Sequence, residues 1–472
     1  MSFSIATKKN CRHFNLRFFL LGAYKAMGNT QHYSSVIVGG GIAGVYLSTK
    51  IEDALLLEAQ PWLGGRIRTM YDETKKKVLL EQGPWRVHES HARMRTLIKK
   101  YNLHLTPTSS SLAGGGSAFD AIVLNEGIAR AREVEQDTGY VGMLDGLANT
   151  DVYHAQHHKK GTYYTVDEGL HALIDAMAEE SKATIQCNSK VKDIQYQHNI
   201  YYITYCQRQG ESIKCFTCTC DRLFLCVPPH VTKQWTIVKQ YLKPQVHSVQ
   251  THPLHHIYAK GDLGRNVHLR TRGVLSQVVS GDYDKRYFQV SYSAGRVAQF
   301  WNRLQLENPS RFRALLQEQL KQEGFEVPLE DVKSFYWHHA VHSWVPLYGS
   351  PSVDSLVKKS IEPHPILLPK LYWAGEAFSS VQGWCEGALQ TAEMVLKACQ
   401  GKSFVLFNTF PDEFVVLDQR VLDVSMWKEV HPGSTAAITK RLKYDISTLF
   451  RHINHSELSW ATVFALQVGY VR

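Results

Sequence analysis

Short apolar runs, separated by glycines and polar turns, define the predicted elements of this chain. Residues 35–38 and 54–57 are continuous apolar runs, typical of parallel strands buried on both faces, and a helix is expected from about Ile42 between them. Further helices are expected over residues 92–101, 170–182, 310–323 and 386–399. Apolar and polar positions alternate between residues 251 and 340, which predicts an antiparallel sheet. These patterns together predict an α/β protein.

A glycine turn links the first predicted strand to its helix. Gly39, Gly41 and Gly44 have the spacing in which the first glycine allows a tight turn, the second a close approach of pyrophosphate, and the third close helix packing. The helix N-terminus would face the phosphates with unpaired N–H groups. Glu58 comes 19 positions after Gly39 (58 minus 39), where an acid accepts ribose hydroxyls. The combination predicts a dinucleotide site; the alternative is a glycine turn in an ordinary βαβ unit.

Length and charge limit the function classes. The chain has 472 residues, enough for two or three domains, and no run of 18 apolar residues, so no membrane span is expected. The net charge is +10, but residues 1–51 supply six basic residues and no acid. The excess therefore belongs to a leader, and a nucleic-acid partner is not expected. We expect residues 1–33 to be a disordered basic leader, compatible with organelle targeting; the cytoplasm is favoured and the compartment stays open.

Two clusters of cysteines and histidines are candidates for metal sites. Nine cysteines at irregular spacing do not indicate a disulfide framework. Cys215, Cys218 and Cys220 could suggest zinc, but Thr and Phe alternate with them as in a strand, and no fourth ligand is suitably spaced. The histidines within residues 154–158, which end a helical stretch over 118–160, have no carboxylate or cysteine near them. This favours a solvated loop there over a metal site.

A second glycine pair follows the acid. Gly64 and Gly65 precede Arg66, whose guanidinium can neutralise a pyrophosphate. Ala-Gly-Glu ending at Glu376 and then Gly383-Trp384 form a second signature. In this order the motifs resemble the flavin amine oxidases: monoamine, polyamine and L-amino-acid oxidases. The resemblance implies FAD, held non-covalently because no cysteine occupies the slot where monoamine oxidases attach their flavin. The cofactor-binding residues that it implies are Gly39, Gly41, Ile42, Ala43, Gly44, Glu58, Gly64, Gly65, Arg66, Gly83, Pro84, Trp85, Val191, Gly375, Glu376, Gly383 and Trp384.

The same resemblance implies four catalytic residues. Residues 83–91 are similar to the L-amino-acid oxidase stretch G-P-M-R-x-P-x-x-H, so Arg86 would bind a substrate carboxylate; the alternative is an arginine paired with a structural acid. The family lysine that holds a water against flavin N5 falls on His256, and a shifted register would give that role to Lys260. Losing the lysine puts fast reaction with oxygen in question. Trp384 matches the aromatic wall beside the flavin; the alternative is a core tryptophan.

The C-terminal segment carries a second signature. A predicted hairpin over residues 414–424 leads to His431-Pro432-Gly433, and His455 ends a later helix 24 positions on (455 minus 431). This resembles cytochrome b5, which implies that His431 and His455 are the two axial ligands of a haem b, for electron transfer and not for oxygen activation. Ser434 replaces the family's second glycine, and most of the family's first strand and helix are missing. The alternative is a remnant without haem.

The resemblance implies an FAD-binding Rossmann-like domain, an antiparallel-sheet α+β substrate domain and a small α+β C-terminal module. We expect the first over residues 34–70, 165–250 and 365–400, the second over 71–164 and 251–364, and the third over 404–472. The implied reaction is oxidation of a C–N bond in an amine or L-amino acid by hydride transfer to flavin. Oxygen, the C-terminal haem or an electron-transfer partner would accept the electrons. A flavin-binding scaffold without activity is the alternative.

Overall fold

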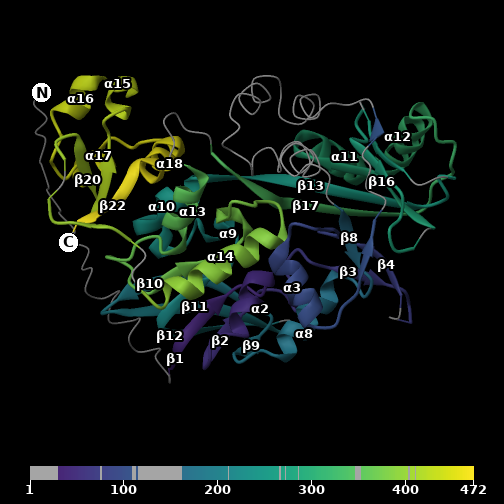
Figure 1. The fold of residues 1–472 in the computed structure, drawn as a ribbon, viewed down its shortest axis with the longest axis horizontal. Helices are drawn as coiled ribbons and strands as arrows, with labels where there is room; N and C mark the ends of the chain where they lie inside the picture. Colours follow the sequence, from purple (N-terminus) through teal and green to yellow (C-terminus); the bar gives the residue numbers. More distant parts are fainter. Residues whose placement is uncertain are drawn as a thin grey trace, which may run out of the picture.

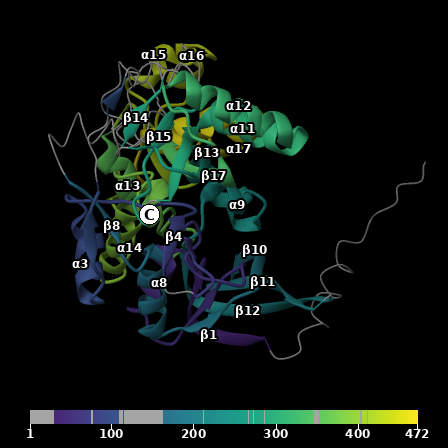
Figure 2. The same cartoon turned by 90° about the vertical axis from the view of Figure 1, so that its right-hand side faces the viewer.

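The computed structural model describes residues 30–74, 77–108, 113–114, 162–210, 212–264, 267–271, 273–284, 286–345, 352–401, 404–409 and 411–471. Three units are visible in Figure 1: a mixed sheet with helices at the bottom, a long antiparallel sheet across the middle, and a small module at the upper left. Figure 2, turned by 90°, shows the mixed sheet below the antiparallel sheet and its helices. The expected stretch over 118–160, with its histidine cluster, lies outside the described residues.

The mixed sheet has seven strands in the order β10-β11-β12-β1-β2-β9, with β18 also paired to β12. β1, β2, β9 and β18 form parallel pairs with their neighbours, whereas β10, β11 and β12 form an antiparallel meander. Its strands are β1 (Gln31–Val38), β2 (Ala54–Leu57), β9 (Thr184–Gln186), β10 (Ser189–Gln197), β11 (Ile200–Gln209), β12 (Ser212–Leu225) and β18 (Leu371–Trp373).

Both faces of this sheet are covered, which explains why β1 and β2 read as continuous apolar runs. One face packs on helices α2 (Ile42–Ser48), α3 (Ala92–Lys100), α8 (Leu170–Glu179) and α14 (Cys385–Ala398). The other face packs on residues that include Trp235, Trp344 and Phe378. Because β1 and β2 are neighbours, the turn after β1 and Glu58 after β2 meet at one edge.

The antiparallel sheet has the order β17-β13-β16-β15-β14-β7, with β7 added in parallel at its edge. Helices α11 (Gly295–Glu307) and α12 (Pro309–Gln322) cover the core of this domain, which centres on Trp301 and Phe312. The strands are β7 (Ala113–Gly114), β13 (Val249–Lys260), β14 (His268–Arg270), β15 (Gln277–Val279), β16 (Tyr287–Ala294) and β17 (Glu330–Trp344). Two small sheets, β3 (Thr69–Tyr71)–β4 (Val78–Glu81) and β5 (Val87–His88)–β8 (Tyr163–Val166)–β6 (Leu105–Pro107), join the two domains.

The C-terminal module is a four-stranded sheet with four short helices. The strand order is β19-β22-β21-β20, and Val415, Leu422 and Val463 are among its buried core residues. Its elements are β19 (Leu406–Phe407), β20 (Phe414–Leu417), β21 (Arg420–Asp423), α15 (Trp427–Val430), α16 (Thr435–Thr439), α17 (Ser447–His452), α18 (Glu457–Leu466) and β22 (Gln467–Val471).

The module packs against the rest of the chain through buried residues. Phe464 of α18 stacks on Trp344 at the end of β17, with ring centroids 6.1 Å apart, and neither side chain is exposed. Arg420 is also fully buried and donates to the carbonyl of Tyr241 at 2.6 Å. His364 bonds to the carbonyl oxygen of Asp418 at 2.9 Å. The interface between the C-terminal module and the rest of the chain is therefore packed like a protein core.

Several elements differ from the sequence expectations. The alternation predicted over residues 251–340 is interrupted at residues 273–276, which form a turn in which Ser276 has φ 61°, so β15 begins at Gln277. The helix expected to reach 182 ends at Glu179. Helix α11 and the short strands β6 and β7 were not predicted. Cys206 and Cys215, opposite each other on β11 and β12, form a disulfide, so Cys215 cannot join a zinc ligand set.

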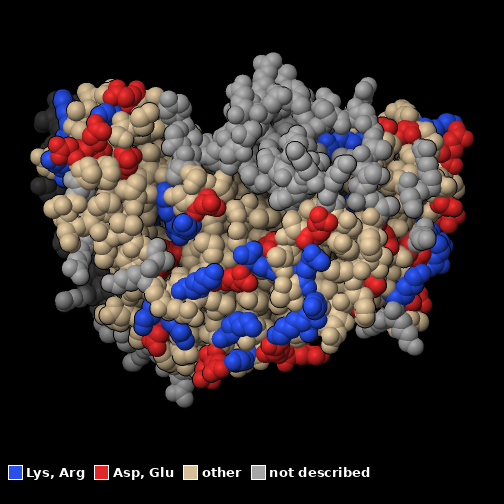
Figure 3. Space-filling view, viewed as in Figure 1, with Lys and Arg blue, Asp and Glu red and all other residues tan. Residues whose placement is uncertain are grey.

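Two further observations concern the helices and the surface charge. None of the described helices is long and apolar enough to cross a bilayer. On the face shown in Figure 3, basic and acidic side chains lie among one another.

Candidate functional site

The glycine turn after β1 has the geometry that the spacing predicts. Gly39 has φ +105°, and a Cβ on Gly44 would lie 1.9 Å from the Gly39 carbonyl oxygen, so both positions need glycine. A Cβ on Gly41 would meet nothing within 4 Å. Gly64 approaches from the second glycine pair, and its N–H donates to the Gly40 carbonyl at 2.7 Å. The open space over Gly41 is where a phosphate could approach the backbone.

Glu58 lies at the edge of this turn and is 8% exposed. Its carboxylate accepts hydrogen bonds from the backbone N–H groups of Gly40 at 2.6 Å and Gln60 at 2.7 Å. Burial raises the pKa of this carboxyl, although these backbone bonds act in the opposite direction. The acid is therefore held rigidly beside the turn, as a ribose-binding carboxylate requires.

The two distant signatures meet in one ion-pair network. Arg66 lies 3.2 Å from the carboxylate of Glu376, and it also donates to the carbonyl of Ala340. His342 donates to the same carboxylate from its backbone N–H at 3.1 Å and bonds it through Nδ1 at 2.9 Å. Burial alone would raise the pKa of Glu376, but Arg66 and His342 outweigh it and hold that pKa far below its usual value. The acid is thus ionised and fixed.

The residues present fit an FAD molecule. A Cβ on Gly375, next to Glu376, would meet nothing within 4 Å, which leaves open space here as at Gly41. Gly83 lies against the Arg66 carbonyl, which a Cβ would approach to 2.1 Å. Trp384 is the N-cap residue of α14, and Val191 is a buried residue of β10. Of the remaining residues that the resemblance implies, Ile42 and Ala43 are buried in the first turn of α2, and Pro84 and Gly383 precede Trp85 and Trp384.

Arg86 lies between β4 and β5 and is 5% exposed. Its Nε is 3.5 Å from the Asp282 carboxylate, and its Nη1 is 3.4 Å from His268 Nδ1. The guanidinium lies over the rings of Trp85 at 5.1 Å and Tyr163 at 5.8 Å. Nε and Nη2 have no hydrogen-bond partner among the described residues. Asp282 offsets the charge of this buried guanidinium, and a bidentate carboxylate ligand could form the two hydrogen bonds that Nε and Nη2 lack.

Ring contacts join Arg86 to the other predicted residues. Trp85 packs edge-on against His256, with centroids 5.5 Å apart. On the other side Tyr163 lies nearly parallel to Trp384, with centroids 6.2 Å apart and planes 19° apart. The structure therefore places Trp384, Tyr163, Arg86, Trp85 and His256 in one connected series.

His256 and Lys260 have different environments. Burial lowers the pKa of His256 to about 3, and Gln289 bonds to its Nδ1 at 3.0 Å. The imidazole is therefore neutral at physiological pH. Lys260 is partly exposed at the far end of β13, opposite Tyr287 and Glu330, and the bulge at Ile257 separates it from His256.

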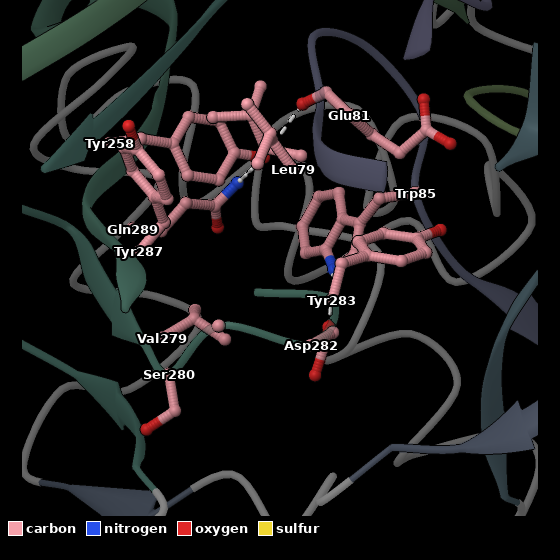
Figure 4. A pocket seen from close by; sticks show the side chains of 12 residues that line it. Leu79, Glu81, Trp85, Tyr258, Val279, Ser280, Asp282, Tyr283, Tyr287 and Gln289 are labelled. Atoms are coloured by element: carbon pink, nitrogen blue, oxygen red, sulfur yellow. Dashed lines mark hydrogen bonds between the residues drawn. The ribbon is translucent and has the colours of Figure 1, made fainter. Parts of the chain in front are cut away.

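Trp85 is one of the residues that line a small cavity (Figure 4). Its volume is about 20 Å³, which is room for a single water molecule. Trp85 Nε1 donates to Asp282 at 3.2 Å, and Tyr258 donates to the Glu81 carbonyl at 2.8 Å. Burial raises the pKa of the Glu81 carboxyl to about 8, while its bonds to the Leu170 N–H and the Thr69 hydroxyl oppose that shift.

The two histidines of the C-terminal module share one arrangement. His431 Nδ1 bonds the Ser434 carbonyl at 3.3 Å, and His455 Nδ1 bonds the Phe450 carbonyl at 2.8 Å. With Nδ1 held by a carbonyl, Nε2 is the nitrogen left to bind a metal. Apolar side chains that a haem would cover are exposed in α15, α17 and the residues that follow them: Val430, Leu449 and Ile453. These residues fit a haem, which would supply one-electron chemistry when bound.

Together, the glycine turn, the acid beside it and the second sheet define a two-domain fold with a dinucleotide-binding turn. Residues 42–144 and 143–395 match the family described as flavin containing amine oxidoreductase. The chain belongs to that family, and FAD is its cofactor. Residues 403–472 match the cytochrome b5-like heme/steroid binding domain, which confirms the second resemblance.

Proteins similar to this chain include an L-amino-acid oxidase and a solved structure. An L-amino-acid oxidase of Bungarus fasciatus is 38% identical over 85 residues, which cover 17% of this chain and 16% of that protein. The crystal structure of a candidate protoporphyrinogen oxidase from Exiguobacterium sp. 255-15 superposes with a TM-score of 0.55 at 13% identity. The superposition covers 79% of this chain and 99% of the Exiguobacterium chain. At 13% identity, the similarity shows a shared fold and nothing more.

Some residues at the site were not identified from the sequence. Tyr163, Asp282 and His268 contact Trp384 or Arg86, but each comes from a segment far from the motifs. His342 joins Arg66 and Glu376. Of these residues, only His342 lies in a stretch whose sequence could have drawn attention to it, since three histidines occur within residues 338–342 between two tryptophans.

Proposed function

We propose that this chain oxidises the C–N bond of a substrate that carries both an amine and a carboxylate, an L-amino acid being the simplest. The observation that carries the proposal is the buried Arg86, with Nε and Nη2 free of hydrogen bonds beside the aromatic series. The partial similarity to an L-amino-acid oxidase supports the same substrate class.

The proposed reaction removes a hydride from the carbon and a proton from the nitrogen, giving an imine that water hydrolyses. Bound FAD supplies the hydride acceptor. Arg86 would hold the carboxylate by two parallel bonds and so orient the α-carbon. Trp384 and Tyr163 would form an apolar wall that excludes water, and neutral His256 would offer a hydrogen bond without adding charge.

The test compares substrates with and without a carboxylate. Arg86→Ala should raise KM for L-amino acids about 100-fold and for the corresponding simple amines less than threefold, because only the former lose a charge-assisted pair. Benzoate, added as a carboxylate probe, should perturb the flavin spectrum of the parent protein and not of Arg86→Ala. Arg68→Ala is the matched control, since Arg68 stacks on Trp62 at 4.0 Å. Equal effects on both substrate classes would refute the carboxylate role.

The C-terminal module favours a second form of this function, in which electrons leave through haem. Each histidine of its pair has Nδ1 bonded to a carbonyl, its interface with the rest of the chain is buried, and the family resemblance assigns the lysine position to His256. Substrate added without oxygen should then shift the Soret band, whereas an oxidase would release peroxide in air. If no amine bleaches the flavin, the scaffold alternative stands.

A further inference from the structure

The end of β17 brings a buried histidine to the cofactor side of the sheet. His342 is 1% exposed, and two of its groups are occupied by Glu376: the backbone N–H at 3.1 Å and Nδ1 at 2.9 Å. Its Nε2 is buried and has no hydrogen-bond partner among the described residues. An unbonded buried imidazole nitrogen needs an explanation, and a ligand atom is the simplest one here.

The tautomer of His342 follows from its bond to Glu376. Glu376 accepts at Nδ1, so Nδ1 carries the proton. Arg66, at 3.2 Å, already neutralises that carboxylate. In the neutral imidazole that carries its proton on Nδ1, Nε2 is an acceptor. A ligand group at Nε2 must therefore donate a hydrogen bond.

Two further histidines line the same region. His230 stacks on His339 with centroids 3.6 Å apart, and its ring is nearly parallel to that of His342 at 6.0 Å. The Nδ1 atoms of His230 and His339 are also without hydrogen-bond partners in the described part of the chain. Burial, and then the neighbouring imidazoles, lower the pKa of His230 to about 3. Open space lies next to Glu376, where a Cβ on Gly375 would meet nothing within 4 Å.

We propose that His342 is a cofactor-binding residue that accepts a hydrogen bond at Nε2 from a ribityl hydroxyl of FAD. The hydroxyls of the ribityl chain can donate this bond, whereas the diphosphate oxygens only accept. The proposal deepens the FAD-dependent function above and rests on FAD binding, not on the identity of the substrate.

The test measures affinity, using apoprotein titrated with FAD and with ADP, which has the diphosphate but no ribityl chain. His342→Leu should weaken FAD binding about tenfold, the effect of one buried hydrogen bond, and leave ADP binding within twofold. His342→Asn, which keeps a polar group but is too short to present an acceptor at the position of Nε2, should behave in the same way and serves if the leucine variant does not fold. His338→Leu is the matched control, because His338 is the exposed end of the same histidine series.

Two results would overturn the proposal. If FAD affinity does not change in either variant, Nε2 binds nothing on the cofactor. If ADP affinity falls as much as FAD affinity, His342 acts through Arg66 and Glu376 on the shared diphosphate or on the fold. Neither result depends on amine oxidation, so a failure of the proposed substrate would leave this measurement interpretable.

Discussion

Substitution of His256 by glutamine should make the protein less sensitive to acid. The imidazole is 2% exposed between Trp85 and Tyr292, and its pKa is lowered to about 3 by burial and then by His255. In the unfolded chain a histidine has a pKa near 6.5. His256 therefore contributes its full share of stability above about pH 6.5, and that share is lost as the pH falls towards 3, because only the unfolded chain takes up the proton.

The size of the effect follows from the two pKa values. This histidine alone should lower the free energy of unfolding by about 2 kcal/mol when the pH falls from 7.5 to 5.0. Glutamine can keep the bond with Gln289, which approaches His256 Nδ1 at 3.0 Å, but it does not titrate. Urea unfolding at pH 7.5, 6.5, 5.5 and 5.0, with saturating FAD and tryptophan fluorescence as the signal, measures the difference between variant and parent.

His104 provides a control of opposite sign. It is exposed, and its bond to Glu168 at 2.6 Å raises its pKa, so it stabilises the fold below its unfolded pKa and loses that effect as the pH rises. His104→Gln should therefore increase acid sensitivity, whereas His256→Gln should reduce it. If the parent and His256→Gln lose the same free energy between pH 7.5 and 5.0, within 0.5 kcal/mol, the buried imidazole is protonated in the fold and the reasoning is wrong.

Three further predictions concern the cofactor sites and a buried acid. Gly41→Ala should leave the free energy of unfolding of the apoprotein within about 0.5 kcal/mol of the parent, since a Cβ there meets nothing within 4 Å, yet it should weaken FAD binding at least tenfold. In Gly44→Ala the new Cβ would lie 1.9 Å from a carbonyl oxygen. That variant should not fold stably, and circular dichroism would report the loss. His455→Ala or His431→Ala should abolish a Soret band while the flavin spectrum is retained, and a haem spectrum unchanged by both would exclude axial ligation. Burial raises the pKa of Glu81 to about 8, so the parent should lose stability as the pH rises from about 4.5 to 8; Glu81→Gln should flatten that slope, and equal slopes in urea unfolding would contradict it.

The buried interface changes how the C-terminal module is understood. A haem module on a flexible linker would reach many partners, but Phe464 and Arg420 are fully buried against the main body here. A haem held by this module would therefore have its distance from the flavin fixed by packing and not by diffusion. Any electron transfer between them would be set by this one geometry.

The sequence alone determined the local features. The turn at Gly39 and Gly44 could be predicted, because steric limits on a Cβ act within a few residues, and Glu58 followed from the length of one βαβ unit. The glycine motifs were also enough to indicate the flavin family, which the family match confirms. The histidine pair was indicated by a second short motif, and two short helices lie between its members.

The remaining features depend on contacts between distant segments. Arg66, His342 and Glu376 are far apart in the sequence, and burial and charge neutralisation brought them together. The neutrality of His256 depends on the rings that exclude water from it, which no local pattern shows. Glycine geometry and helix spacing are local properties of a chain, whereas desolvation and ion pairing depend on which distant segments pack on each other.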